Sequence, residues 1–416
     1  MLAWSIQAAA QLSDTDLEAL RLQGQVLGWT FEIGETPATR LQAHALCGIR
    51  VPPDWRSRAR FIEPTAKVDL PEQFDWRELG ACTPVRNQHG CGGCWAFATI
   101  APLESAILLK DGVEVDLSEQ WLISCNTDGY NCDEGGWFAH EYHLDKPDAC
   151  GHSGAVLEAD CPYEADDMPC ACPYPHVYHI DDWAYVGGEE DIPPIDHIKW
   201  AIMAFGPVAA CLCTDATFGG YRGGIYNNNV LCEEVNHAVA IVGWDDIQGM
   251  NGVWIIRNSW GSSWGEGGYM RIEYGCSRIG FGACVVDYPG ETPGDGPDIL
   301  EQPSAGCVAA GLPYTFGIDA ASDAGPIRYQ WLRDGLVVTP QRSGPELYLT
   351  RVAPADEGVY TCVARDQRGA SVSEPALLDV TENRVPGAGS AALVALSVLL
   401  TLLGALMAPR RTCRRG

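Results

Sequence analysis

Two cysteines, Cys91 and Cys94, stand three residues apart in "GCGGCWAF", directly before an apolar run with helical spacing. Such a pair suits a redox dithiol, half of a metal site, or one structural cysteine beside a reactive one. A thiol attacks carbonyl carbons as the thiolate, and the start of a helix favours that anion through its unpaired N–H groups. The run "CWAFATIAPLESAILL" predicts a helix that places the Cys94 sulfur at its first turn.

A proton partner for this thiol is offered by His237, which opens the strand-like run "HAVAIVGW". Asn258 ends a second apolar run, "VWIIRN", and its amide can orient the imidazole if the two strands are neighbours. Gln88 lies six residues before Cys94 and can direct a side-chain N–H to the place where an oxyanion develops. These residue types indicate acyl transfer with a cysteine nucleophile.

Three blocks of the sequence, "PVRNQHGCGGCWAF", "NHAVAIVGW" and "RNSWGSSWGEGGYMRI", resemble in this order the signatures of the papain and cathepsin family of cysteine peptidases. The resemblance implies an α+β fold with a helical lobe, a β-barrel-like lobe and an active cleft between them. It implies no metal and no cofactor. It also implies a role for each of five residues: Cys94 as nucleophile, His237 as base and acid, Asn258 as orienting amide, Gln88 as oxyanion donor, and Trp260 as the shield of the His237–Asn258 bond.

The segment "CDEGGWF" would bind substrate according to the same resemblance. Gly135 and Gly136 offer backbone for pairing with an extended peptide. Trp137 and Phe138 would wall the pocket for the second residue before the scissile bond.

Disulfides are expected at several places in the peptidase region. The resemblance assigns Cys91 to Cys132 and Cys125 to Cys170, which leaves Cys94 as the free thiol of its pair. Two further pairings are expected with a choice of partner: Cys232 with Cys276 or Cys284, and Cys150 with Cys161 or Cys172.

The composition of the 416 residues restricts the partners of the chain. Lys and Arg number 27 against 55 Asp and Glu, a net charge of −28, which disfavours nucleic acid or an anionic membrane surface as a partner. Eighteen cysteines spread along the chain favour disulfides and therefore an exported protein. The start, "MLAWSIQAAAQLSD", lacks the basic segment of a signal peptide, so we expect the export signal upstream.

Composition shifts divide the chain into segments. Residues 1–67 resemble a shortened propeptide, with a helix around "DTDLEALRLQGQVLG", which would lie in the active cleft until cleavage near residues 67–70. The other predicted segments are a peptidase domain (68–289), a linker (290–297), an immunoglobulin-like domain (298–381), a second linker (382–388), a transmembrane helix (389–408) and a basic cytoplasmic tail (409–416).

Short alternating runs between turn residues predict an all-β sandwich in residues 298–381. Trp331, Tyr360 and Cys362 resemble the immunoglobulin pattern, with the tyrosine at its corner position. Ile318 stands where the partner of Cys362 belongs, 13 residues before Trp331. A bridge from Cys307 to Cys362, which is not the standard one of the pattern, or aliphatic packing in its place are the two expectations. This domain would act as a spacer or as a binding module for an extracellular ligand.

The stretch "GSAALVALSVLLTLLGALMA" is uncharged, has the ~20 residues of a membrane-spanning helix, and is followed by four arginines. It predicts a cell-surface protein with a single C-terminal anchor. A buried core helix, a glycolipid-anchor signal, and a bacterial sorting signal that is cut after export are the alternatives.

The predicted function is a cysteine endopeptidase made as a zymogen, which acts on protein or peptide substrates at the cell surface. A binding protein on an inactive peptidase scaffold is one alternative, and a disulfide oxidoreductase using Cys91 and Cys94 is another. An exopeptidase is a third, if the insertion "ACGHSGAVLEADC" closes one end of the cleft and His152 binds a terminal carboxylate.

Overall fold

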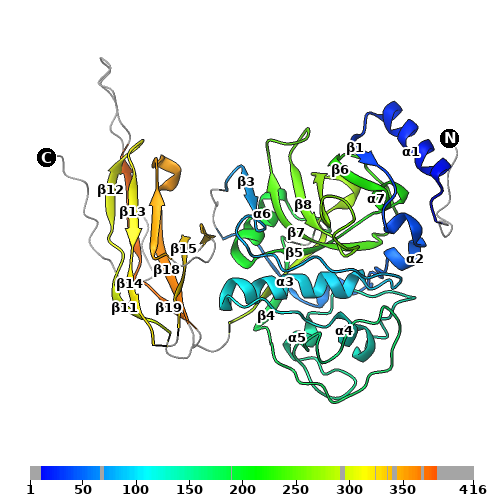
Figure 1. Ribbon diagram of the computed structural model, residues 1–416, viewed down its shortest axis with the longest axis horizontal. Helices are drawn as coiled ribbons and strands as arrows, with labels where there is room; N and C mark the ends of the chain where they lie inside the picture. Colours follow the sequence, from blue (N-terminus) through cyan, green and yellow to red (C-terminus); the bar gives the residue numbers. More distant parts are fainter. Residues whose placement is uncertain are drawn as a thin grey trace.

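The computed structural model describes residues 11–65, 70–188, 190–290, 296–323, 325–334, 336–339, 344–366 and 370–381. The predicted propeptide, residues 1–67, is called the leader below. A β-sandwich lies at one end of the molecule, the peptidase region fills the middle, and the first helices of the leader lie at the other end (Figure 1). The predicted membrane helix at 389–408 lies outside the described residues, as does most of the expected cleavage region at 67–70. Within the described part of the chain, no helix is long and apolar enough to cross a membrane.

The leader begins with a well-capped helix. Ser13 and Asp16 form a capping box at its start, and Gly28 ends it in the left-handed conformation with φ 72°, which glycine adopts without strain. The helix lies where the sequence predicts one. The leader elements are α1 (Asp14–Leu27), β1 (Thr30–Ile33), η1 (Ala38–Arg40), α2 (Ala43–Leu46), η2 (Trp55–Ser57) and β2 (Arg60–Ile62).

The peptidase region combines short helices with a large sheet, as expected for an α+β fold. Its helices are α3 (Cys94–Asp111), α4 (Glu119–Cys125), α5 (Glu141–Leu144), α6 (Ile195–Phe205), α7 (Ala216–Gly219) and η3 (Cys276–Arg278). Its strands are β3 (Gln73–Asp75), β4 (Asp182–Val186), β5 (Val208–Leu212), β6 (Tyr221–Tyr226), β7 (His237–Asp245), β8 (Val253–Arg257), β9 (Tyr269–Glu273) and β10 (Phe281–Asp287).

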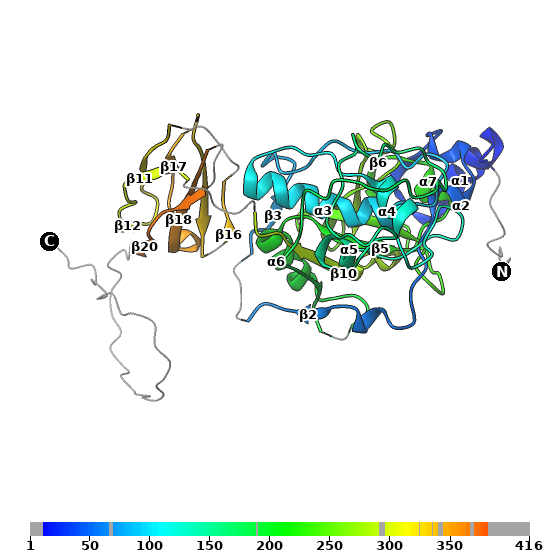
Figure 2. The same ribbon diagram turned by 90° about the horizontal axis from the view of Figure 1, so that it is seen from below.

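The sheet runs in the order β1-β6-β9-β8-β7-β5-β10-β4-β2, with β3 paired to β7. Every residue of β5, β7 and β8 is buried, which explains their nearly continuous apolar sequences. The leader supplies the strand at each end of this order, β1 antiparallel to β6 and β2 parallel to β4. Figure 2 shows the leader running along the peptidase region to reach β2. The leader is therefore part of the sheet.

Helix α3 crosses the centre of the molecule, and its first residue is Cys94 (Figure 1). Residues 94–107 are all buried, so the helix carries apolar residues on every side. Pro102 lies inside it, and Gly112 ends it in the left-handed conformation with φ 68°. The helix predicted to start at Cys94 is thus observed, and its start is held in the interior.

Four disulfides are present in the peptidase region: Cys91–Cys132, Cys125–Cys170, Cys150–Cys172 and Cys213–Cys232. The first two are the pairs that the family resemblance implies, and the third is one of the two choices for Cys150. The expectation for Cys232 was wrong. Cys232 is bonded to Cys213, which directly follows β5, whereas Cys276 and Cys284 are free and buried. Because Cys91 is bonded to Cys132, it forms no dithiol with Cys94 in this structure.

The C-terminal sandwich has its own core around Trp331, which is fully buried and lies opposite Cys362 across paired strands. Ile318 belongs to the same core, as expected from its position. The Tyr360 hydroxyl donates to the Asp356 carbonyl at 2.8 Å, which is the tyrosine-corner contact. The elements are β11 (Asp298–Glu301), β12 (Gly306–Ala309), β13 (Tyr314–Gly317), β14 (Asp319–Ala321), β15 (Arg328–Arg333), β16 (Leu336–Val337), β17 (Glu346–Leu349), η4 (Pro354–Asp356), β18 (Gly358–Arg365), β19 (Ala370–Val372) and β20 (Ala376–Thr381).

Candidate active site

The Cys94 thiol lies at the start of α3, fully buried, where the helical lobe meets the sheet. The backbone N–H of Gly48, a leader residue, donates to its sulfur at 3.3 Å. The backbone of Ala238, the second residue of β7, also lies within hydrogen-bonding reach of the thiol. The fold therefore brings Cys94 to the head of the strand that begins with His237.

His237 and Asn258 meet because β7 and β8 are antiparallel neighbours, so the start of one lies beside the end of the other. The Nε2 atom of His237 is 2.8 Å from the Asn258 Oδ1 atom. The Trp260 ring lies 4.7 Å from the imidazole ring, and it is nearly buried. The fold brings these three residues into one region, with the Trp260 indole beside the imidazole, and the role of Trp260 as a shield stays a prediction.

Gln88 lies in the same interior region, with its amide oxygen and nitrogen both engaged. Its Oε1 atom accepts a hydrogen bond from the Ser259 hydroxyl at 2.6 Å. Its Nε2 atom lies 3.2 Å from the carbonyl oxygens of Ala45 and Leu46, and 3.0 Å from that of Cys91. Two of these three acceptors belong to the leader, so the leader occupies the predicted oxyanion donor.

The leader backbone crosses the site in an extended conformation around Gly48. The N–H of Gly136 donates to the Gly48 carbonyl at 2.8 Å, and the Arg50 N–H donates to the Gly136 carbonyl at 2.9 Å. On the other side, the N–H of Ile49 donates to the Asn236 carbonyl at 3.3 Å. The leader thus pairs with the glycine segment predicted to bind substrate, and also with the residue before His237.

Only glycine fits at the closest points of this crossing. A Cβ atom at Gly48 would overlap the Gly92 carbonyl oxygen. A Cβ atom at Gly135, where φ is 73°, would overlap the Gly48 carbonyl oxygen. Gly48, in the stretch "LCGIRVPPDW", was not among the predicted site residues, unlike the glycines of the peptidase region.

Burial under the leader suppresses charge at the site. Desolvation raises the pKa of Cys94 to about 11, although hydrogen bonds from the backbone of Gly48 and Ala238 favour the thiolate. Desolvation lowers the pKa of His237 to about 4, against the favourable contact with Asn258. The helix start was expected to lower the pKa of Cys94. With the leader in place, the loss of solvent outweighs the helix, so both groups are neutral near pH 7.

Trp137 and Phe138 are fully buried, so neither lines an open pocket in the leader-bound state. Trp55 of the leader packs on Trp137, with ring centroids 5.9 Å apart, and on Tyr185 at 4.9 Å. Trp55 is itself only 4% exposed. The role of Trp137 and Phe138 as walls of a substrate pocket applies to a cleft without the leader, and it stays a prediction.

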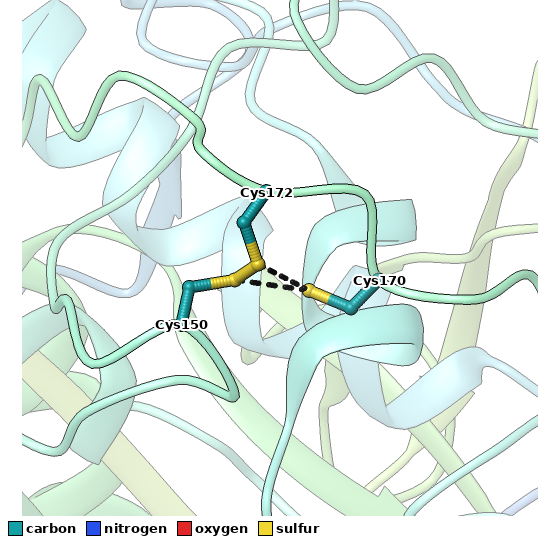
Figure 3. Close-up of side chains that lie close together, drawn as sticks. All are labelled: Cys150, Cys170 and Cys172. Carbon is teal, nitrogen blue, oxygen red and sulfur yellow. Dashed lines mark hydrogen bonds between the residues drawn. A yellow bond between two sulfur atoms is a disulfide. The ribbon is translucent and has the colours of Figure 1, made fainter.

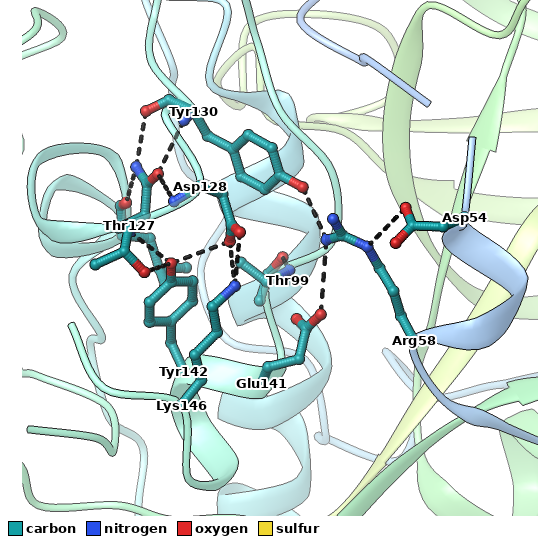
Figure 4. Close-up of polar contacts among 12 residues, drawn as sticks. Asp54, Arg58, Thr99, Thr127, Asp128, Tyr130, Glu141, Tyr142 and Lys146 are labelled. Carbon is teal, nitrogen blue, oxygen red and sulfur yellow. Dashed lines mark hydrogen bonds and ion pairs between the residues drawn. The ribbon is translucent and has the colours of Figure 1, made fainter. Parts of the chain in front are cut away.

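A partly buried arginine attaches the leader to the helical lobe (Figure 4). Arg58 Nη1 donates to the Tyr130 hydroxyl at 2.8 Å and lies 3.7 Å from Glu141. Its Nε atom lies 3.7 Å from Asp54, also in the leader. Burial raises the pKa of Glu141, although Arg58 opposes the shift. Arg58 was not among the predicted site residues, because an arginine in a stretch such as "PPDWRSRAR" is ordinarily an exposed loop residue.

Comparison with known proteins identifies the family. The profile of the papain family cysteine proteases matches residues 70–287, more than half of the chain, and an immunoglobulin domain profile matches residues 319–380. The protein therefore belongs to the papain family of cysteine proteases and is a hydrolase of the cysteine endopeptidase class.

Relatives of known name support this assignment. Macrodontain-1 of Ananas macrodontes is 37% identical over 219 residues, which cover 52% of this chain and 95% of that protein. Fruit bromelain of Ananas comosus is 36% identical over 218 residues, or 52% of this chain, and the match spans only 58% of its own length.

A solved structure resembles the peptidase together with its leader. Digestive procathepsin L2 of Tenebrio molitor aligns with a TM-score of 0.57 and 28% identity, over 66% of this chain and 89% of that one. This share of the chain is larger than the peptidase domain alone occupies. The fold is that of a papain-family zymogen.

Replacing Gly48 with valine tests whether the close packing at this residue holds the leader in the site. The added side chain overlaps the Gly92 carbonyl, and such overpacking costs about 1–3 kcal/mol, or roughly 5- to 150-fold in leader occupancy. We expect faster hydrolysis of a fluorogenic peptide by the leader-intact chain. Arg40→Ala, which removes an exposed ion pair with Glu35 elsewhere in the leader, should leave the rate unchanged. Equal rates for Gly48→Val and the parent protein would contradict this account.

The pKa of Cys94 should fall when the leader is removed. With the leader bound the pKa is about 11, so the thiol is protonated at neutral pH and becomes thiolate only as the pH rises toward that value. Iodoacetamide labelling as a function of pH, mapped by mass spectrometry, should show the inflection at a lower pH after leader removal. Cys82 is the internal control: burial raises its pKa to about 12, and the charged and hydrogen-bonding groups that act on it, Arg257, Asp75, Arg77 and Tyr269, all lie outside the leader. An unchanged Cys94 inflection would show that the leader does not set its pKa.

Proposed function

We propose that the protein hydrolyses internal peptide bonds through Cys94, His237 and Asn258. The Cys94 sulfur attacks the carbonyl carbon after its proton passes to His237. The oxyanion is stabilised by the Gln88 side chain and the backbone N–H of Cys94. His237 then protonates the leaving amine, and water hydrolyses the thioester with His237 as base. Asn258 keeps the imidazole in its productive orientation, and Trp260 excludes water from their hydrogen bond.

The observation that carries this proposal is the contact between His237 and Asn258 at 2.8 Å, beside the strand head that the free Cys94 thiol approaches. The path of the leader supports the proposal further. Leader carbonyls accept hydrogen bonds from the Gln88 amide and the Gly136 backbone N–H, the donors that a substrate would need. We infer that Gly135 and Gly136 pair with substrate once the leader has left, and that Trp137 and Phe138 then contact its side chains.

The proposal extends to the location of the enzyme. We propose that it is exported and held at the cell surface by the apolar stretch 389–408, with residues 409–416 in the cytoplasm. The immunoglobulin-like domain would then hold the peptidase away from the membrane or bind an extracellular ligand. The support for this arrangement is the sequence of the C-terminal stretch and the order of the segments along the chain, in which the sandwich follows the peptidase region and precedes the apolar stretch.

Replacing Asn258 with alanine tests the catalytic assignment. We expect kcat/KM of the leader-free enzyme to fall about 100-fold, the scale of a misplaced general base, while the fold is retained. An epoxide-type thiol inhibitor should label Cys94 in the parent enzyme, and Cys94→Ala should abolish both labelling and hydrolysis. Asn251→Ala, in an exposed turn, is the matched control. Leader-free enzyme that neither hydrolyses peptides nor labels at Cys94 would refute the proposal.

Deleting residues 389–416 tests the anchor. The parent protein should stay with carbonate-washed membranes of the expressing cell, and the truncated protein should appear in the medium, because the apolar stretch is gone. A second truncation that removes only residues 409–416 keeps the apolar stretch and should remain membrane-bound. Recovery of the parent protein in the soluble fraction would rule out a retained membrane helix.

A further inference from the structure

A cluster of two histidines and an aspartate lies in the helical lobe, outside the residues assigned to catalysis. Asp148, His152 and His176 each offer one ligand atom, and these atoms lie within 4.8 Å of one another. The Asp148 and His176 side chains are only 1% and 8% exposed, and His152 is exposed at the mouth of the cluster. Two buried ligand atoms with an open side are the arrangement of an ion site that solvent can reach.

The hydrogen bonds of His176 leave one ring nitrogen available. Its Nδ1 atom is 2.7 Å from the Gly154 carbonyl oxygen, and since a carbonyl can only accept, Nδ1 carries the proton. In the tautomer with its single proton on Nδ1, the Nε2 atom presents a lone pair. Nε2 is buried and has no hydrogen-bond partner among the described residues. A backbone carbonyl on one ring nitrogen is the usual support for a histidine that binds a metal through the other.

The spacing between His176 and Asp148 favours an ion over a direct hydrogen bond. His176 Nε2 lies 3.7 Å from Asp148 Oδ2. A charge-assisted hydrogen bond between them would be roughly 2.7–2.9 Å long. Two ligands of one tetrahedral Zn²⁺, each at about 2.0–2.1 Å from the metal, stand roughly 3.4 Å apart. The observed 3.7 Å is closer to the distance between two zinc ligands than to the length of a hydrogen bond.

The Asp148 carboxyl group is held in a fixed orientation by three hydrogen bonds. The Trp121 Nε1–H donates to Oδ2 at 3.0 Å, while the backbone N–H groups of Cys150 and His152 donate to Oδ1 at 2.8 and 3.1 Å. Among the described residues, His176 is the only basic side chain within ion-pair distance of this carboxyl group. The ligand oxygen is therefore positioned before an ion arrives.

Disulfides fix the two segments that carry the ligands. Cys150 lies between Asp148 and His152, and it is bonded to Cys172, four residues before His176 (Figure 3). The sulfur of Cys170 lies 3.5 Å from both Cys150 and Cys172, but it is bonded to Cys125. The three sulfurs are therefore committed to disulfides and do not form a thiolate metal site. Their bonds instead hold the Asp148 turn against the His176 segment.

We propose that Asp148, His152 and His176 form a binding site for a divalent transition-metal ion of the Zn²⁺ class. A carboxylate oxygen and two imidazole nitrogens supply three ligands, and water completes a tetrahedron on the open side. The His152 ring stacks over His176, with centroids 5.6 Å apart and planes at 25°, and a rotation of this exposed side chain brings its nitrogen to the ion. The ion ties the Asp148 turn to the His176 segment. In this role His152 binds a metal ion, which differs from the binding of a substrate's terminal carboxylate considered in the sequence analysis.

The test is a titration of the full-length Cys94→Ser chain with Co²⁺, after chelator treatment and without reductant, so that the disulfides stay intact. The Cys94→Ser change removes the reactive thiol as a competing ligand. We expect one Co²⁺ per chain, with the visible absorption of a tetrahedral site, displaced by Zn²⁺. His152→Ala and His176→Gln should each weaken binding by at least about tenfold.

The matched control is His179→Ala in the same background. His179 is an exposed histidine of the same segment, and its Nε2 atom lies 3.0 Å from the Ser153 carbonyl oxygen, outside the cluster. Binding should be unchanged in this variant. His152 is exposed, so its replacement leaves the core intact, and a circular dichroism spectrum verifies the fold of His176→Gln. Absence of saturable Co²⁺ binding would overturn the proposal. So would equal loss in His179→Ala, or unchanged affinity in both His152→Ala and His176→Gln.

Discussion

The backbone of Gly48 lies against the Cys94 sulfur and between the glycines of the peptidase loops, and the state of the whole site depends on this contact. It removes water from a thiol and an imidazole at once. Burial disfavours the charged form of each, so the thiol keeps its proton and the imidazole takes none. The segment that pairs with the predicted substrate-binding glycines therefore lies where both groups are held in their uncharged forms.

The leader is integrated into the fold at several places. Strands β1 and β2 are the outermost strands of the main sheet, and Arg58 is held by Tyr130 and Glu141 in the helical lobe. Trp55 covers an aromatic surface that includes Trp137 and Tyr185. Each contact is modest, but together they distribute the leader over both lobes. Departure of the leader uncovers apolar surface in the lobe that contains Trp137.

The helical lobe below α3 has little regular structure after α5, and covalent bonds replace the missing hydrogen-bond ladder. The bond Cys125–Cys170 joins the end of α4 to a loop, and Cys150–Cys172 joins two loop segments. A disulfide restricts the unfolded chain and thereby stabilises a loop that buries little apolar surface. The second bond also links the segment of Asp148 to that of His176.

The sequence by itself determined the helix that begins at Cys94, the helix of the leader and the sandwich around Trp331. These features are local or follow a strong periodicity, so neighbouring residues suffice to predict them. The two disulfides implied by the family resemblance are also present. Only the tertiary structure decided the partner of Cys232, the burial of Trp137 and Phe138, the seat of Gly48 and the grouping of His152 with His176. Each of these depends on which distant segments come into contact and on how much solvent that contact excludes. The spacing of neighbouring residues carries information on neither.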